Sequence, residues 1–331
     1  MPETVSVCLK MCGIDKMDSG LVMKILESAG RFREETGCMV YPRYFNEPTT
    51  RDDFVEIIEK QFDLGLTFDS FWFPTNGSGL ATLPDGKWER LAGTGWSWLR
   101  LHFHHAGQEH DSFLGKPGAW EILSETARRA EKHGIEWYPV IFINKHNAHR
   151  YEEIRSAVER VGSPSLPAGW MVPNWQNNPC YDVNRVSYSQ ISHLVGEKSQ
   201  WKSEKDIIRM ISSDAVLSSS KAFNTDCGIY YLGCLPNGDV YYAGGCHGEP
   251  FTEHSNKMTI GSFLADDRIE VFLERAMSNP PEQVKLLSET TFGELANEFG
   301  NPESDLVYRI QDLVVNKWGS QLLNKVYSSR S

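Results

Sequence analysis

Short apolar stretches rich in β-branched and aromatic residues alternate with helical patterns along the first half of this 331-residue sequence. The expected strands begin at intervals of roughly 30–37 residues, the length of one strand–helix unit. They begin near Thr4, Met39, Phe68, Trp98, Ile135 and Trp170. Because strands joined by helices pair in parallel with right-handed crossovers, this order predicts the α/β class. Six units predict a partial (β/α)6 barrel of TIM type over residues 1–221, since a complete eight-stranded barrel takes about 250 residues.

The connections between these strands carry apolar residues at helical spacing. The third connection, residues 80–95, has only a weak helical pattern. The other four have apolar faces with a 3.6-residue period, at Leu21/Ile25/Leu26/Ala29, Phe54/Ile57/Ile58/Phe62, Trp120/Leu123/Ala127/Ala130 and Ile154/Ala157/Val158/Val161. We therefore expect a helix in each of these four connections.

The alternation stops after about Ser163, and a different pattern follows. Helical segments are expected near residues 188–196 and 204–220. Residues 228–242 predict a β-hairpin, because Pro236-Asn237-Gly238 separates two apolar stretches and Asn-Gly is a strong hairpin-turn signal. The sequence therefore predicts a small α+β extension over residues 222–331, with a helix near 269–276 and further helices after Pro281.

Charge and hydropathy exclude several classes of partner. The formal net charge is −11 and there is no long basic run, whereas nucleic-acid binding needs Lys and Arg to neutralise phosphates. The sequence has neither a basic-then-apolar signal segment nor about 18 consecutive apolar residues, so no membrane association is expected. We therefore predict a cytoplasmic protein. Its seven cysteines are expected to be metal ligands, reactive thiols or core residues rather than disulfides.

Two cysteines lie where the first strand passes into its loop, in the pattern Cys8-x-x-x-Cys12-x-x-Asp15. Thiolates suit iron–sulfur clusters. The spacing resembles the Cys-x-x-x-Cys-x-x-Cys pattern with which one superfamily of enzymes holds three irons of a [4Fe-4S] cluster. The third position here is Asp15, a harder oxygen ligand. It can either ligate iron with an altered potential or leave a degenerate site without a stable cluster.

Polar residues follow the expected strands one after another. Besides the segment after the first strand, they occupy residues 46–48, 75–79, 102–105, 144–147 and 174–177. The carboxyl ends of parallel strands meet at one rim, where α/β barrels carry their active sites. Six polar loops in succession therefore indicate an active site at this rim.

The order of these motifs resembles the radical S-adenosylmethionine (SAM) superfamily over residues 4–275. Besides the two cysteines, the matching segments are residues 45–48 (Phe-Asn-Glu-Pro), 75–80 and 110–119. Residues 227–261 resemble a SPASM or Twitch extension, with a cysteine, a hairpin with an Asn-Gly turn, a cysteine and Ile-Gly before a helix. The resemblance implies an enzyme that cleaves SAM to a 5′-deoxyadenosyl radical, which abstracts hydrogen from the substrate.

The resemblance also implies a set of site residues. Cys8, Cys12 and Asp15 would hold the [4Fe-4S] cluster, and SAM would bind its open iron. Glu47 stands in place of the glutamate of the family's Gly-Gly-Glu-Pro segment, near the amino group of SAM's methionine moiety. The remaining residues implied in the SAM site are Asn46, Asn76, Ser78, His104 and Asn144, with His102 beside the ribose or the substrate. An electron donor such as flavodoxin or ferredoxin is the implied protein partner.

The cysteines of the second half suggest an auxiliary iron–sulfur cluster. Cys180, Cys227, Cys234 and Cys246 can supply four thiolates, although their spacing departs from the family's. The family places a cysteine five residues after the turn glycine, and that position here is Ala243. Cys234 lies within an expected strand, where a buried inert thiol is the alternative.

Two other functions stay open beside the radical SAM enzyme. His102 and His104 alternate at the end of one strand, so a zinc-dependent hydrolase of TIM-barrel type can use them as ligands. A fold that has lost its cluster can bind SAM or a partner protein, and Asp15 favours this possibility. For the enzyme we expect a small metabolite or natural-product intermediate as substrate. A peptide is not favoured, because the chain begins almost at the first strand and leaves no room for a leader-binding domain.

Overall fold

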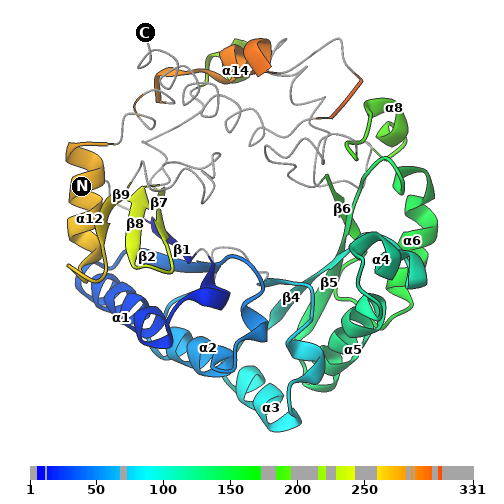
Figure 1. Ribbon diagram of the computed structural model, residues 1–331, viewed down its shortest axis with the longest axis horizontal. Coiled ribbons are helices and arrows are strands. Elements are labelled where there is room, and N and C mark those ends of the chain that lie inside the picture. The colour runs from blue at the N-terminus through cyan, green and yellow to red at the C-terminus, as the bar shows by residue number, and fades with distance from the viewer. Residues whose placement is uncertain are drawn as a thin grey trace.

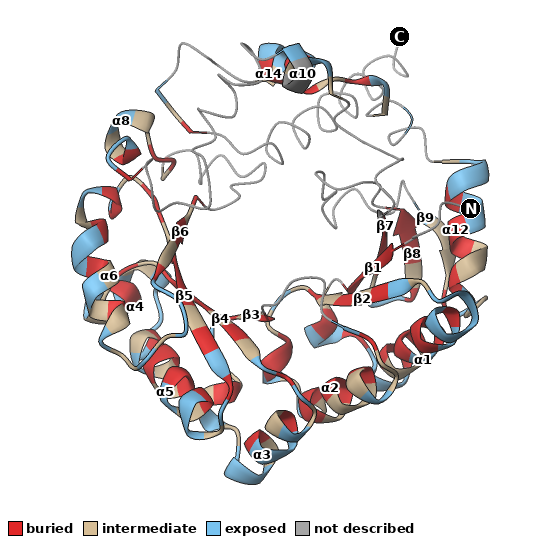
Figure 2. Ribbon diagram, turned by 180° about the vertical axis from the view of Figure 1, so that it is seen from behind, coloured by how far each residue is buried: buried red, intermediate tan, exposed pale blue. Residues whose placement is uncertain are grey.

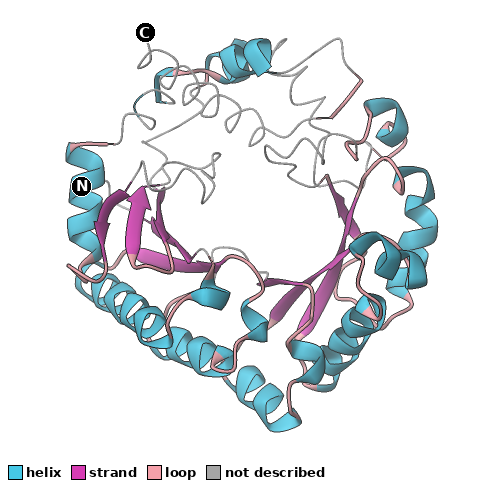
Figure 3. Ribbon diagram, in the orientation of Figure 1, coloured by secondary structure: helices cyan, strands magenta, loops and turns pink. Residues whose placement is uncertain are grey.

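The computed structural model describes residues 6–11, 13–67, 73–172, 184–194, 215–220, 229–242, 259–280, 285, 288–299 and 305–307. Figure 1 shows the order of the elements along the chain. The described strands stand on the inside and most of the helices lie outside them, as Figure 3 shows. No helix in these ranges is long and apolar enough to cross a membrane.

The first six strands lie close to the predicted positions. They are β1 (Ser6–Met11), β2 (Met39–Tyr44), β3 (Phe73–Thr75), β4 (Trp98–Phe103), β5 (Glu136–Phe142) and β6 (Gly169–Met171). β1 pairs in parallel with β2, and β3, β4, β5 and β6 pair in parallel in that order. The predicted α/β class is confirmed. Closure into one (β/α)6 barrel stays a prediction, because the described residues include no pairing between β2 and β3.

Helices fill the connections between these strands. α1 (Ser19–Thr36), α2 (Phe54–Asp63), α5 (Ala119–Lys132) and α6 (Tyr151–Glu159) occupy the four connections with a clear apolar face. The third connection also forms a helix, α3 (Asp85–Gly93), and α4 (Gly107–Leu114) lies between β4 and α5. Only Trp88 and Leu91 of α3 are buried, which explains the weak helical pattern in its sequence.

The main core lies between the strands and the outer helices. Along β4, Leu99, Leu101 and Phe103 are fully buried, and the ring of Phe103 contacts Trp120 of α5 at 5.5 Å between centroids. Figure 2 shows buried residues concentrated where the helices meet the strands. Because successive strand residues point to opposite sides, the alternate residues of β4, which include Arg100, lie on the inner face.

The predicted hairpin forms, and it joins the sheet of β1. β7 (Ile229–Cys234), β8 (Asp239–Tyr242) and β9 (Thr259–Ser262) extend this sheet in the order β2-β1-β7-β8-β9. β7 is parallel to β1, whereas β8 and β9 are antiparallel to their neighbours. Gly238 has a φ of 85° in the turn between β7 and β8, as an Asn-Gly turn requires. The hairpin of the predicted extension thus continues the sheet that begins with the first two strands.

Helices of the second half complete the described structure. α12 (Ile269–Ser278) lies beside α1, and Lys24 Nζ of α1 donates to Phe263 O at 2.6 Å just before it. The others are α8 (Tyr188–Ile191), α10 (Ala215–Ser219) and α14 (Phe292–Phe299). α8 and α12 confirm two of the predicted helical segments, whereas residues 204–214 lie outside the described ranges. The division of the chain at residue 221 stays a prediction.

Candidate active site

The loops after β1 and β2 meet at the carboxyl ends of these strands. After β1 the chain forms a short turn, η1 (Ile14–Lys16), in which Asp15 is exposed. Asn46 Nδ2 donates to Asp15 Oδ1 at 2.8 Å. Asn46 has a φ of 71°, a left-handed conformation that asparagine adopts more readily than most residues other than glycine. Two of the predicted site residues are therefore in direct contact.

The carboxylate of Glu47 joins the ends of β2 and β3. Its Oε1 accepts hydrogen bonds from Thr49 Oγ1 at 2.5 Å and from Thr75 Oγ1 at 2.7 Å. Its Oε2 accepts from the Asn76 N–H at 2.7 Å. Hydrogen bonds to an ionised carboxylate are short and strong, so Glu47 fixes the two strand ends relative to each other. Oε2 keeps a second lone pair with which it can accept from a ligand.

The loop after β3 packs tightly against the loop after β2. A Cβ atom added to Gly79 would lie 1.7 Å from Thr49 O, so the approach requires glycine. Asn76 Oδ1 accepts from the Ser78 N–H at 2.9 Å, and Ser78 Oγ accepts from Lys116 Nζ at 2.9 Å. Asn76 and Ser78 therefore lie at the same rim as Glu47. Lys116 lies there too, although the sequence predicted no role for it.

Arg51, which also had no predicted role, holds the loop that carries Asp15. Its Nη1 donates to Ile14 O at 2.5 Å and to Met17 O at 2.6 Å. Its Nε pairs with Asp53 Oδ1 at 2.7 Å, and this hydrogen bond lowers the pKa of Asp53. The acceptors in the loop are main-chain carbonyls 34 and 37 residues away, so no local sequence pattern distinguishes Arg51 from a surface arginine.

Two buried asparagines organise the loop after β5. Asn147 Nδ2 donates to His104 O at 2.5 Å and to Phe142 O at 2.8 Å, so it joins the ends of β4 and β5. Asn147 Oδ1 accepts from the Asn144 N–H at 2.8 Å. Asn144, a predicted site residue, is fully buried, and its Nδ2 has no hydrogen-bond partner among the described residues. Such a group is stabilised by a ligand that pairs with it.

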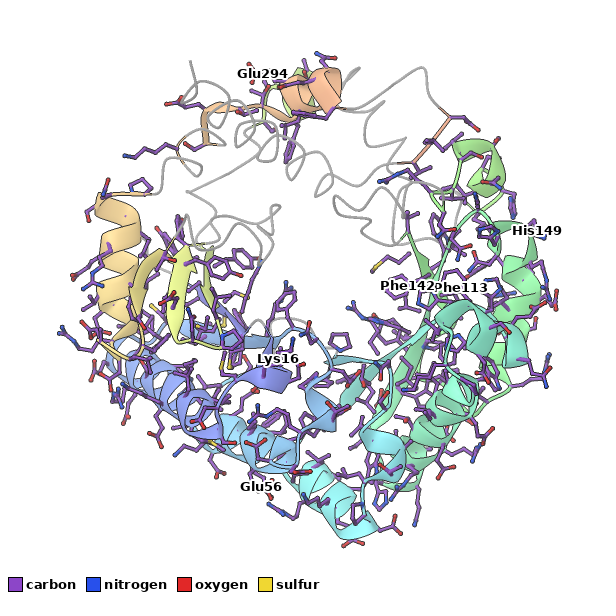
Figure 4. All side chains as sticks on the ribbon, viewed as in Figure 1. Lys16, Glu56, Phe113, Phe142, His149 and Glu294 are labelled. Atoms are coloured by element: carbon purple, nitrogen blue, oxygen red, sulfur yellow. The ribbon has the colours of Figure 1, made fainter. Side chains whose placement is uncertain are left out.

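Three imidazoles gather at the end of β4 and the start of α4. His110 Nδ1 accepts from the N–H groups of His104 and His105 at 3.2 and 3.5 Å. The ring of His104 stacks on Phe113 at 4.8 Å and approaches Phe142 at 5.2 Å, and Figure 4 shows both phenylalanines on this side of the molecule. Burial lowers the pKa of His110 to about 4 and that of His104 to about 3, so both rings are neutral at pH 7. His104 Nδ1 is buried without a partner in the described part of the chain.

His102, the other histidine of the predicted zinc pair, lies on the inner face of β4. Arg100 Nε donates to its Nε2 at 3.0 Å, and its ring packs on Phe142 at 4.7 Å. Burial and then the charge of Arg100 lower the pKa of His102 well below its usual value. Within the described ranges, no group of three His, Cys, Asp or Glu side chains could hold a metal ion. These residues therefore supply no third ligand for a zinc site at His102 and His104.

Cys8 and Asp15, two of the three predicted cluster ligands, lie at different depths. Cys8 is fully buried within β1, three residues before the strand ends, and Asp15 lies beyond that end. A strand rises about 3.3 Å per residue, so Cys8 lies roughly 10 Å below the rim. Iron can bind both a thiolate and a carboxylate. Cys8, however, lies too deep within β1 to stand beside Asp15. The third ligand, Cys12, lies outside the described residues.

Cys234 faces away from the interior. It is fully buried in β7 and lies in one register row with Met11 of β1 and Val240 of β8. The row continues to Gly261 of β9, where an added Cβ would lie 2.7 Å from the ring of Phe272 in α12. Because paired residues of neighbouring strands point to the same face, Cys234 faces α12.

Cys8 lies on the opposite, inner face of the same sheet, since it stands three positions before Met11 and successive strand residues alternate between the two faces. The other predicted ligands of the auxiliary cluster, Cys180, Cys227 and Cys246, lie outside the described residues. The auxiliary cluster therefore stays a prediction.

The fold is similar to that of solved radical SAM enzymes. Native anSMEcpe with bound AdoMet (SAM) and Cp18Cys peptide matches with a TM-score of 0.56 at 14% identity, covering 99% of this chain and 100% of that one. Native anSMEcpe with bound AdoMet gives a TM-score of 0.55 at 12% identity, covering 98% and 100%. Coproporphyrinogen III oxidase (HemN) from Escherichia coli, a radical SAM enzyme, gives only 0.43 at 12% identity, covering 73% and 65%.

Sequence comparison adds nothing to this likeness. No protein-family model and no curated protein matches the chain. At 14% identity and below, the similarity to anSMEcpe is a similarity of fold.

Proposed function

We propose that this chain is a radical SAM enzyme that binds SAM at the rim and acts on a small molecule. The observation that carries the proposal is the position of residues 45–48 at the end of β2. There Asn46 contacts Asp15, and the carboxylate of Glu47 binds the end of β3. The resemblance puts the methionine moiety of SAM beside this segment. The likeness in fold to structures with bound AdoMet supports the same assignment.

In this proposal the rim residues orient SAM. Glu47 Oε2 accepts from the amino group of the methionine moiety, and Asn46, Asn76 and Ser78 lie along the same edge. His104 Nδ1 and Asn144 Nδ2 are buried polar atoms without described partners. Both can pair with the hydroxyl groups or ring nitrogens of the nucleoside, which relieves the cost of leaving them unpaired.

The resemblance assigns the [4Fe-4S] cluster of this proposal to Cys8, Cys12 and Asp15, of which Cys8 lies deeper in β1 than a ligand beside Asp15 would. Together with SAM, that cofactor supplies reductive formation of a 5′-deoxyadenosyl radical, which abstracts hydrogen from the substrate. The chain's contribution is to orient SAM and the substrate and to exclude water. The electron donor would be a small protein such as flavodoxin or ferredoxin.

A SAM-binding protein without a cluster is the second candidate. Two observations favour it. Cys8 lies inside β1 rather than in the loop, and an amide hydrogen bond from Asn46 engages Asp15 where a third thiolate would stand. The fold and the SAM site are the same in both candidates, so iron content separates them.

Anaerobic reconstitution with iron and sulfide tests both candidates. The enzyme predicts a brown protein that forms 5′-deoxyadenosine from SAM and dithionite, and the double variant Cys8→Ala/Cys12→Ala should lose iron and activity. Cys38→Ala, which changes a partly buried thiol outside the predicted site, is the matched control and should behave as wild type. A colourless protein that binds SAM supports the second candidate. A protein that fails to bind SAM at all contradicts both.

A further inference from the structure

Below the rim, the inner face of β4 and β5 carries a positively charged group. Arg100 is the register partner of Tyr138 on this face. Burial raises the pKa of Tyr138, and the nearby charge of Arg100 opposes that rise. The Nε of Arg100 donates to His102 Nε2 at 3.0 Å, and His102 is neutral at pH 7. No Asp or Glu among the described residues pairs with the guanidinium, so these neighbours leave its charge uncompensated.

Two more cations lie on the inner face of the neighbouring sheet. Lys10 of β1 and Arg43 of β2 are register partners, and Lys10 Nζ lies 4.6 Å from the centroid of the Tyr231 ring. The described acidic residue on the inner side of β5 is Glu136, which is exposed at the opposite end of the strand from the rim.

A row of aromatic rings connects Arg100 with the rim. His102 contacts Phe142 at 4.7 Å, Phe142 approaches His104 at 5.2 Å, and His104 stacks on Phe113 at 4.8 Å. His104 lies four positions after Arg100, which corresponds to roughly 13 Å along an extended chain. A molecule of this length can contact Arg100 at one end while its other end lies beside the SAM site.

We propose that Arg100 binds an oxyanion group of the substrate, a carboxylate or a phosphate, whose reacting end reaches the rim. The identification of this ligand as the substrate rests on the proposed function. The guanidinium is a planar fork that binds two oxygens of such a group at once. A partly buried cation is costly without a counter-charge, and an oxyanion supplies one. His102 and Tyr138 orient the fork, because the neutral Nε2 of His102 accepts from Nε and the side chain of Tyr138 shares a further hydrogen bond with Arg100. The guanidinium has five N–H donors, so the remaining ones can bind the ligand.

Binding of two simple probes to the full-length protein tests this site. Calorimetric titration with sodium benzoate and with inorganic phosphate reports which oxyanion the site accepts. Arg100→Gln should weaken binding of the preferred probe by about tenfold or more, because it removes a charge-assisted bidentate contact. Arg100→Lys keeps the charge but not the planar guanidinium, so its affinity for the probe should lie between those of wild type and Arg100→Gln. Arg128→Gln, which changes an exposed arginine paired with Glu121 and Glu125, is the matched control and should bind as wild type.

The affinity for SAM, measured on the same samples, separates this proposal from the proposed function. Arg100→Gln should bind SAM as tightly as wild type does, and this binding also shows that the variant is folded. If Arg100→Gln does not fold, the affinity of Arg100→Lys for the probe tests the proposal instead. The oxyanion site is overturned if neither probe binds wild type, or if the Arg100 variant that folds binds the probe as tightly as wild type does. If the probe binds through Arg100 and SAM does not bind, the site stands and the proposed function fails.

Discussion

At the scale of single residues, polar side chains of the candidate site also hold the fold together. Glu47 joins β2 to β3, Asn147 joins β4 to β5, and Arg51 binds the loop after β1. Each contact connects segments that are distant in sequence and holds two strand ends or loops together at the rim. The rim is therefore a network, and its residues are expected to affect stability as well as ligand binding.

The buried histidine cluster predicts that the protein loses stability in mild acid. The pKa of His110 is about 4 in the folded protein and about 6.5 in the unfolded chain, so below pH 6.5 the unfolded state binds more protons. The neutral His110 ring therefore contributes its full stabilisation to the folded state above pH 6.5, and this contribution to the free energy of unfolding is lost as the pH falls toward 4. At pH 4.5 the loss from His110 is about 2–3 kcal/mol. Urea unfolding measured at pH 7.5 and at pH 4.5 checks this.

The variant His110→Asn isolates this contribution, because its side-chain oxygen can still accept from the N–H groups of His104 and His105. Between pH 7.5 and pH 4.5 the free energy of unfolding of this variant should fall by about 2–3 kcal/mol less than that of wild type. Equal pH dependence in both proteins would mean that His110 is not held neutral by burial.

At the scale of elements, the loops after β2 and β3 interlock, and their backbones touch. This contact brings Glu47 to the end of β3, so the geometry of the candidate SAM site depends on it. The loops belong to neighbouring strand–helix units. A change in their packing therefore moves two predicted ligand-binding segments at once.

Gly79→Ala should disrupt this contact. Its Cβ would lie 1.7 Å from Thr49 O, which is main-chain and cannot move without the loop. We expect a loss of about 2–4 kcal/mol in the free energy of unfolding and a much lower SAM affinity. The control is Gly86→Ala in α3, where an added Cβ meets nothing within 4 Å. That change should be neutral or stabilise the helix by up to about 1 kcal/mol. Equal stability of the two variants would contradict the interlocked loops.

At the scale of the whole molecule, the beginning and the later part of the chain share one sheet. β1 lies between β2 and β7, and all six residues of β1 are buried. α1 is also tied to the segment before α12, through Lys24 and through the ion pair of Arg31 with Asp267 at 3.0 Å. The fold of the predicted barrel therefore depends on residues that follow position 221.

A chain truncated after residue 221 should not fold cooperatively. Without β7, β1 becomes an edge strand and Val7, Leu9 and Met11 lose part of their cover, which favours aggregation. Near-UV circular dichroism and urea unfolding measure the effect, and co-expression of residues 222–331 should restore soluble protein. A truncated chain that unfolds cooperatively and binds SAM would instead establish residues 1–221 as an independent domain.

The sequence by itself determined the features that depend on neighbouring residues. Apolar spacing located the strands and the outer helices, and the Asn-Gly turn located the hairpin of β7 and β8. The rim could be anticipated because the carboxyl ends of parallel strands meet there. The motif at residues 45–48 is short, and its residues are consecutive, so the place of Glu47 in the candidate site followed from the order of motifs.

Only the tertiary structure decided how distant segments meet. Nothing in the local pattern of residues 229–234 indicates that they pair with β1, more than 200 residues earlier. Arg51 and Asn147 act through main-chain carbonyls, which every residue carries, so sequence patterns cannot identify these contacts. The depth of Cys8 within β1 likewise depends on the packing of several strands, and so does the position of Arg100, which pairs with no Asp or Glu in the part of the chain that the structure describes. The physical reason is that burial and pairing are set by the whole chain, whereas helical and strand periodicity is set by a few neighbouring residues.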